Sequence, residues 1–110
     1  METNWLSFEL GDLWRKSEDK TLLAEEITTA WQSLYAALPP YIPRYRYNRV
    51  LDHWWHEGNR ACGTVRSTIP MVRSGERKDS ALWYSLRELF HYLQYILMYK
   101  ELREKAEQAN

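Results

Sequence analysis

Residues 80–99 read SALWYSLRELFHYLQYILMY, and the spacing of their apolar residues decides the fold class. The main apolar stripe steps by four, three, four and three positions; its members are Leu82, Leu86, Leu89, Leu93 and Ile96. This spacing is that of one face of an α-helix. A second stripe consists of Trp83, Phe90 and Leu97. The helix is therefore apolar over much of its circumference, which is typical of the central helix in a bundle.

Two shorter helices are expected earlier in the chain. Residues 3–16 carry apolar residues at helical spacing, and residues 22–38 repeat the pattern more clearly. Ser17 and Asp19 are plausible N-caps for the second of these helices, since their side-chain oxygens can accept hydrogen bonds from free backbone N–H groups. The prolines at 39–40 end this helix, because proline lacks a backbone donor and disfavours α geometry in the residue before it.

A third helix is expected to begin with Pro43 in its first turn. Its apolar stripe comprises Tyr47, Val50, Leu51, Trp54 and Trp55. Gly58 and Asn59 form a natural C-cap, although the helix could resume over residues 60–67. Residues 70–78 contain proline, serine and glycine among basic side chains, and this composition predicts a loop.

The last helix is expected to begin after a cap at Asp79 or Ser80 and to run to about Gln108. Strand signals are nearly absent, because the one alternation, over residues 41–47, is interrupted by a proline. The sequence therefore predicts an all-α fold. Its architecture is a four- to five-helix bundle with a long C-terminal helix, in a single domain spanning residues 1–110.

The composition is that of one globular domain. Of 110 residues, 45% are hydrophobic and 27% are charged, which argues against a disordered chain. No apolar run approaches the roughly 20 residues that span a bilayer. Residues 1–10 lack the features of a signal peptide, and the single cysteine, Cys62, cannot form an internal disulfide. We therefore expect an intracellular, cytoplasmic protein without a membrane partner.

The net charge of zero conceals a segregation of sign along the chain. Residues 1–43 carry seven acidic and three basic side chains, a net charge of −4. Residues 44–78 carry eight basic and three acidic side chains, a net charge of +5, and residues 79–110 carry −1. A protein that needs only solubility tends to mix its signs. The segregation therefore favours a basic surface for an anionic partner, or for an acidic patch on another copy.

The basic residues are most concentrated in residues 44–49, which read RYRYNR. Arginine forks match phosphate oxygens and aromatic faces accept bases, so this pattern is typical of contact with RNA or single-stranded DNA. The residues predicted to bind nucleic acid are Arg44, Tyr45, Arg46, Arg49, Arg60, Arg66, Arg73, Arg77 and Lys78. The alternative is a solvated basic face that pairs with acidic residues of the first two helices.

Neither a metal site nor a catalytic centre is predicted. His53, His56 and Cys62 form an incomplete ligand set, because structural zinc sites take four protein ligands and no Cys-x-x-Cys pair exists. The histidines flank Trp54 and Trp55, and packing beside these aromatics is the simpler account of them. Arg–His pairs four residues apart occur twice, but helical ribonucleases of the HEPN type use a slightly longer gap. The sequence predicts no cofactor and no enzymatic activity.

The chain contains six Trp and eight Tyr, which are many for one small core, so several are expected at an interface. Five residues of the last helix lie on or near one side: Tyr92, Tyr95, Met98, Tyr99 and Leu102. We predict that Tyr92 and Tyr99 contact a protein partner. Tyr95 and Leu102 are expected to complete the core.

In size, helical class and balance of basic and aromatic residues, the chain resembles the small all-helical subunits of CRISPR effector complexes. The resemblance covers general character over the whole chain and no specific residues. It implies a role in antiviral defence, with repeated copies contacting guide RNA or a displaced DNA strand. The leading hypothesis is a non-catalytic helical subunit of a nucleoprotein assembly. The alternative is a protein–protein interaction module, such as a phage inhibitor or a helical adaptor, that uses an aromatic surface.

Overall fold

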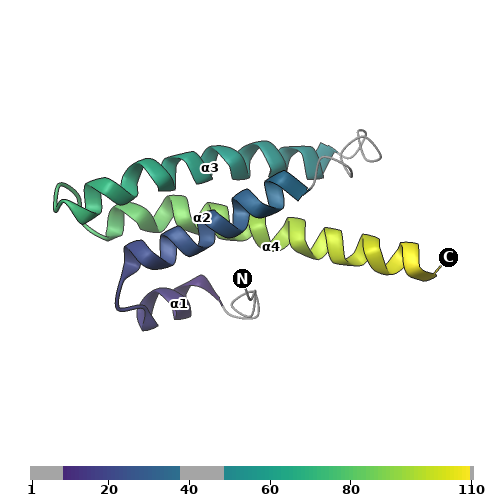
Figure 1. Cartoon of the computed structure of the whole chain (residues 1–110), viewed down its shortest axis with the longest axis horizontal. Helices are drawn as coiled ribbons and strands as arrows, with labels where there is room; N and C mark the ends of the chain where they lie inside the picture. Colours follow the sequence, from purple (N-terminus) through teal and green to yellow (C-terminus); the bar gives the residue numbers. More distant parts are fainter. Residues whose placement is uncertain (1–8, 38–48, 110) are drawn as a thin grey trace.

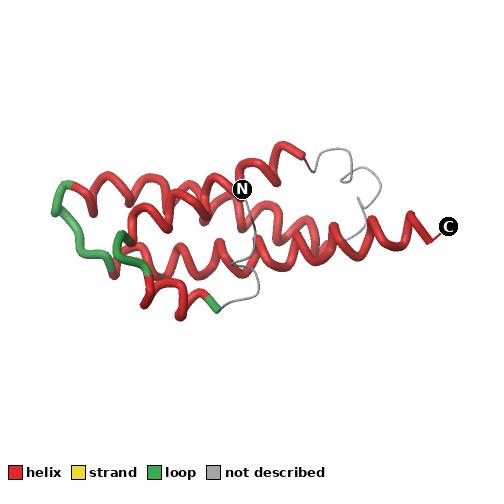
Figure 2. The backbone as a smooth tube through the Cα atoms, turned by 60° about the horizontal axis from the view of Figure 1, so that its bottom comes forward, coloured by secondary structure: helices red, strands yellow, loops and turns green. Residues whose placement is uncertain are grey.

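The computed structural model describes residues 9–37 and 49–109, and these ranges contain four α-helices and no strand (Figure 1 and Figure 2). The helices are α1 (Leu10–Lys16), α2 (Lys20–Ala37), α3 (Arg49–Arg73) and α4 (Ser80–Ala109). The prediction of an all-α bundle with a long C-terminal helix is confirmed. Residues 3–8 of the first expected helix lie outside the described residues, and α1 begins at Leu10.

The three long helices pack side by side in a molecule that measures 52 × 23 × 19 Å. α3 runs antiparallel to both α2 and α4 (Figure 1). The short helix α1 lies beside the first part of α4, where the Trp14 and Trp83 rings meet edge-on with 5.4 Å between their centroids. α4 is the longest helix, and its C-terminal end extends past the ends of α2 and α3 (Figure 1).

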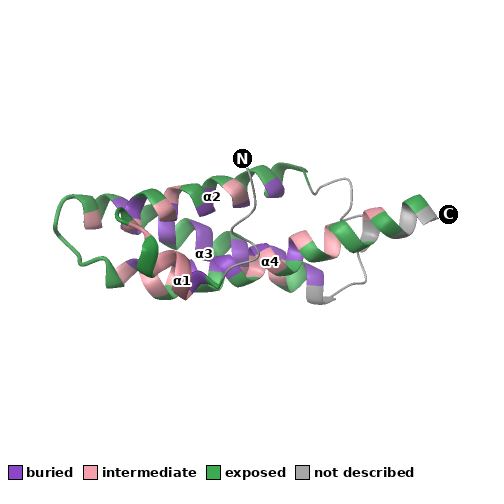
Figure 3. Ribbon diagram, turned by 90° about the horizontal axis from the view of Figure 1, so that it is seen from below, coloured by how far each residue is buried: buried purple, intermediate pink, exposed green. Residues whose placement is uncertain are grey.

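The core is built along the predicted stripe of α4, which is completely buried. α2 adds Ala24, Ile27, Trp31 and Leu34. α3 adds Leu51, Trp55, Ala61, Cys62, Val65 and Ile69. Buried segments of the helices face one another, and exposed segments lie on the outer sides (Figure 3). Burial of each such Leu, Ile or Val side chain stabilises the fold by about 1.5–3 kcal/mol, so the stripe of α4 is the main source of cohesion.

Asp19 caps α2, as predicted. Its Oδ1 accepts hydrogen bonds from the backbone N–H groups of Thr21 (3.0 Å) and Leu22 (3.1 Å), and from the Thr21 hydroxyl (2.6 Å). These hydrogen bonds lower the pKa of the Asp19 carboxyl, and the one from the Thr21 hydroxyl contributes most. Lys20 Nζ donates to the carbonyl of Trp14. The C-terminal end of α1 is thereby tied to the first residue of α2.

α3 differs from the prediction at two places. The expected C-cap at residues 58–59 is wrong, because α3 continues through Gly58. The loop expected over residues 70–78 begins only after Arg73, because the helix also includes Pro70. Pro70 removes only one backbone hydrogen bond, close to the point where the helix ends. The chain reverses instead at Gly75, whose φ of 79° lies in the left-handed region that favours glycine.

Gly58 lies inside the helix because the Trp31 ring of α2 packs directly against it. Trp31 is only 1% exposed. A Cβ placed on Gly58 would lie 2.6 Å from both Cζ2 and Cζ3 of that ring, far inside van der Waals contact. The Trp31 indole N–H points to the side-chain oxygen of Asn59 at 3.5 Å, and the Trp55 ring lies 6.3 Å away between centroids. The missing side chain at Gly58 therefore sets how closely α2 approaches α3.

Replacement of Gly58 by Ala is expected to destabilise the bundle, although alanine is the better helix former. The added methyl group overlaps the Trp31 ring, and such overpacking costs about 1–3 kcal/mol or more. Gly63→Ala on the same helix is the matched control, because nothing lies within 4 Å of a Cβ there. This control is expected to raise the free energy of unfolding by about 0.5–1 kcal/mol in chemical denaturation. Equal stabilisation by the two alanines would show that the ring does not fill this space.

Candidate functional site

The residues predicted to bind nucleic acid do not form one continuous described surface. Arg44, Tyr45 and Arg46 lie outside the described residues, as does the side chain of Arg49, whose backbone begins α3. The other five lie along α3 and in the turn that follows it: Arg60, Arg66, Arg73, Arg77 and Lys78. Two of these five are engaged in ion pairs between helices.

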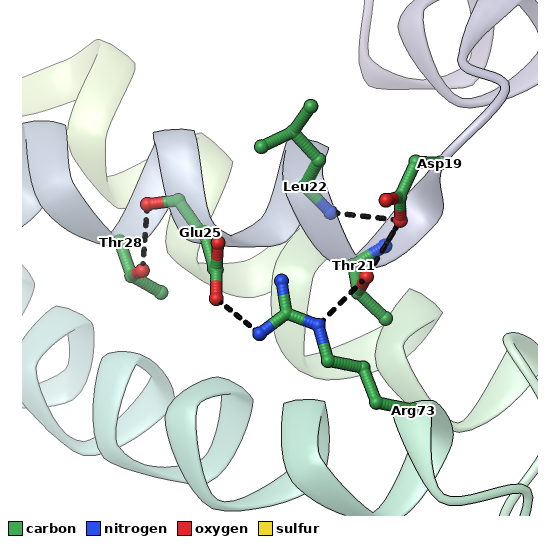
Figure 4. A network of polar contacts seen from close by, with 6 residues as sticks. All are labelled: Asp19, Thr21, Leu22, Glu25, Thr28 and Arg73. Atoms are coloured by element: carbon green, nitrogen blue, oxygen red, sulfur yellow. Dashed lines mark hydrogen bonds and ion pairs between the residues drawn. The ribbon is translucent and has the colours of Figure 1, made fainter.

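Arg73 joins the C-terminal end of α3 to α2 (Figure 4). Its Nη1 lies 2.6 Å from Glu25 Oε1, and its Nε donates to the Thr21 hydroxyl at 3.3 Å. The hydrogen bond from Arg73 lowers the pKa of the Glu25 carboxyl. Because the Thr21 hydroxyl donates in turn to Asp19, the guanidinium is linked to the N-cap of α2. Arg73 therefore pairs with an acidic residue of α2, as the alternative interpretation of the basic residues expects.

Arg60 joins α3 to α4. Its Nε lies 2.8 Å from Glu57 Oε2 one turn earlier, and its Nη2 lies 3.1 Å from Glu88 Oε2 on α4. The hydrogen bond from Arg60 lowers the pKa of the Glu57 carboxyl. Arg60 and Glu88 are exposed and Glu57 is partly exposed, so these pairs add little to stability. They nevertheless direct the guanidinium toward partners within the chain.

Arg66, Arg77 and Lys78 are exposed and form no ion pair with any residue that the structure describes. Arg66 lines an open groove of about 340 Å³ between α2 and α3, together with Thr29 and Gln32. A guanidinium beside hydroxyl and amide groups can bind an anion such as a phosphate. Arg77 and Lys78 lie in the turn between α3 and α4. Within residues 49–109, these three cations are the described part of the predicted basic surface that is available to a partner.

His53, His56 and Cys62 do not form a common site. His56 Nε2 lies 3.2 Å from Asp52 Oδ1, and the His53 ring meets the Tyr92 ring edge-on at 6.2 Å. Cys62 is buried, and this burial raises the pKa of its thiol. Nucleophilic attack requires the thiolate, so the position of Cys62 does not favour catalysis. In the part of the chain that the structure describes, no cluster of three His, Cys, Asp or Glu side chains could hold a metal ion.

The outer face of α4 carries an exposed row of large side chains. The three most exposed large apolar side chains among the described residues are Tyr84 (73%), Leu102 (61%) and Met98 (59%). Two further exposed residues complete the row, and its successive members are seven, four, three and four residues apart. This spacing keeps them on one face, opposite the buried stripe. The row, called the outer stripe below, consists of Tyr84, His91, Tyr95, Met98 and Leu102.

The expectation that Tyr95 and Leu102 complete the core is wrong. Tyr95 is 43% exposed, although its ring contacts that of Trp54 with 5.0 Å between centroids. Leu102 lies beyond Ile96, which is the last buried residue among the described side chains of α4. The C-terminal end of α4 extends past α2 and α3 (Figure 1). None of the helices that the structure describes buries Leu102.

Tyr92 and Tyr99, the predicted protein contacts, are half-buried and flank the outer stripe. Each directly follows a residue of that stripe. Tyr92 lies toward α3, where it meets His53, and burial raises the pKa of its hydroxyl. The sequence-based prediction did not include Tyr84 and His91. The seven-residue step between them is the signal that could have found them.

No protein-family model matches the sequence, and neither a curated protein nor a solved structure matches it. None of the helices that the structure describes has a stretch that is long and apolar enough to cross a membrane. Two features of this chain's own surface are therefore the candidates for function. One is the outer stripe of α4, and the other is the set of exposed cations at Arg66, Arg77 and Lys78.

Proposed function

We propose that this chain is a non-catalytic protein–protein interaction module that binds a helical partner through the outer stripe of α4. The exposure of this stripe is the observation that carries the proposal. Tyr84, Met98 and Leu102 are each more than half exposed, on a helix whose other face forms the core. Large apolar side chains gathered on one exposed face often mark an interaction site. A partner that covers the stripe removes apolar surface from water, at about 25 cal/mol per Å².

The spacing of the stripe favours a helix as the partner. From His91 to Leu102 the steps are four, three and four residues, which is the heptad spacing of the seam in a two-helix coiled coil. Tyrosine combines an apolar ring with a polar tip, and methionine adapts its shape to a facing surface. Because the leucine stripe holds α4 in the bundle as far as Ile96, docking along that part of the helix requires little additional ordering of the backbone.

A photo-crosslinking residue in place of Met98 is expected to form a protein adduct in the cells that produce this chain. The adduct should be digested by protease and resist nuclease. Leu102→Glu should abolish it, because the charge falls within the stripe, while the helical circular dichroism and the melting temperature stay unchanged. The same crosslinker in place of Arg66, on another face, is the matched control and should give no such adduct. Crosslinking from position 66 and not from position 98 would contradict the proposal.

A second candidate function is contact with nucleic-acid backbone inside a larger assembly. Arg66, Arg77 and Lys78 support it, because each is exposed and without an ion-pair partner among the described residues. The sequence adds the arginines and tyrosines of residues 44–49. In this hypothesis the chain acts like the small CRISPR subunits that it resembles in general character, and the outer stripe holds neighbouring subunits together.

For this second function, affinity for single-stranded RNA or DNA should fall steeply with salt, because each neutralised phosphate releases counterions. The salt slope is the slope of the logarithm of the binding constant against the logarithm of the salt concentration. Replacement of Arg66, Arg77 and Lys78 together by Ala should lower its magnitude by about 2, because each phosphate contact contributes about 0.7 for single strands. Replacement of the three arginines within residues 44–49 should lower it similarly. Arg15→Ala on α1 is the control and should leave the slope unchanged. Absence of binding by the parent at physiological salt would rule out this candidate for the isolated chain.

A further inference from the structure

We infer that the helical partner of the outer stripe is a second copy of this chain, docked antiparallel along α4. The inference rests on the proposed function and names its partner. Three features of α4 support it: the order of side chains along the stripe, the length of the helix, and the charges that flank the stripe.

The order of the stripe residues suits a twofold axis across the helix. In an antiparallel pair, each residue faces the residue that mirrors it about the axis. With the axis crossing the outer face of α4 at the height of residue 93, Tyr84 of one copy faces Leu102 of the other, and His91 faces Tyr95. Each of these contacts is made twice. The contact region from Tyr84 to Leu102 is about 27 Å long, at 1.5 Å per residue.

The length of α4 fits the same arrangement. The C-terminal end of α4 projects beyond α2 and α3 (Figure 1). Leu102 is 61% exposed and follows Ile96, the last buried residue among the described side chains of α4. Antiparallel docking places this end of α4 over the Tyr84 end of the other copy, so the two most exposed residues of the stripe cover each other. Met98 then faces the aliphatic stem of Glu88, whose carboxylate is held toward α3 by Arg60 at 3.1 Å.

Charge complementarity selects the antiparallel orientation. Arg87 and Glu101 are fourteen residues apart, which is two heptads, so both lie on the same flank of the stripe. In antiparallel docking, side chains on the same flank of the two copies meet about two residues off the exact mirror position, so Arg87 of each copy lies next to Glu101 of the other. In parallel docking Arg87 would instead face the other flank of the stripe, where Ser85, Tyr92 and Tyr99 lie and no acidic side chain is present.

Both charges are available for such contacts. Arg87 is exposed and has no ion-pair partner among the residues that the structure describes. Glu101 is exposed and lies 3.1 Å from Lys105 in a pair on the helix surface. Surface pairs of this kind contribute little to stability, so the Glu101 carboxylate can turn to a second guanidinium at small cost.

Sedimentation equilibrium of the full chain, from micromolar to near-millimolar concentration, tests the inference. The parent should form a dimer, and Met98→Glu should abolish it. Arg87→Glu and Glu101→Arg should each raise the dissociation constant roughly tenfold or more, since each converts two attractions per dimer into two repulsions. The double variant should restore dimerisation. Arg66→Glu is the control and should dimerise like the parent, and circular dichroism verifies that every variant is folded.

A parent that stays monomeric over the whole range overturns the inference. The proposed function survives that result if position 98 still crosslinks to a different protein in a Leu102-dependent manner. A dimer that tolerates Met98→Glu also overturns the inference, because self-association then uses another surface. If either single charge reversal weakens the dimer and the double variant does not restore it, the antiparallel register is overturned. Restoration supports both the surface and the register.

Discussion

The contact between the Trp31 ring and the backbone of Gly58 sets how closely α2 packs on α3, and α4 packs its leucine stripe against this pair of helices. Because no side chain separates them, the indole is buried in the middle of the interface. Trp55 lies beside it and stacks on Tyr35 with 4.0 Å between ring centroids and 11° between planes. At this separation of the two helices, Arg73 at the far end of α3 reaches α2, and α4 packs its leucine stripe against both helices.

The arginine-rich centre of the chain serves the fold as well as any partner. Arg73 connects α3 to α2, and Arg60 connects α3 to α4. A guanidinium suits this role because its fork donates in several directions at once: Arg60 meets both Glu57 and Glu88. The segregation of charge along the sequence is therefore partly an internal complementarity, in which positive side chains of α3 meet negative side chains of its neighbours. Fewer cations are left for an external anion than the sequence alone suggests.

The features that depend on local chemistry were predictable from the sequence, and those that depend on neighbouring helices were not. The leucine periodicity of α4 and the cap at Asp19 are local, and both predictions are confirmed. From the sequence, Gly58 predicts a helix end, because glycine is a poor helix former. In the structure it lies inside the helix, because the ring of Trp31, 27 residues earlier in the chain, fills the space that a side chain would take. Periodicity likewise shows which residues share a face and does not show where the adjacent helices stop. For that reason Leu102 was expected in the core and is exposed instead.

Amide hydrogen exchange at low and at high protein concentration tests most directly whether another copy covers the outer stripe of α4. Backbone amides of residues 24–31, in the buried part of α2, should exchange slowly at both concentrations, because their protection comes from the core of a single copy. Residues 91–102 should exchange markedly more slowly at the higher concentration, since docking there stabilises the projecting end of the helix. Equal exchange of residues 91–102 at both concentrations would contradict self-association through this face.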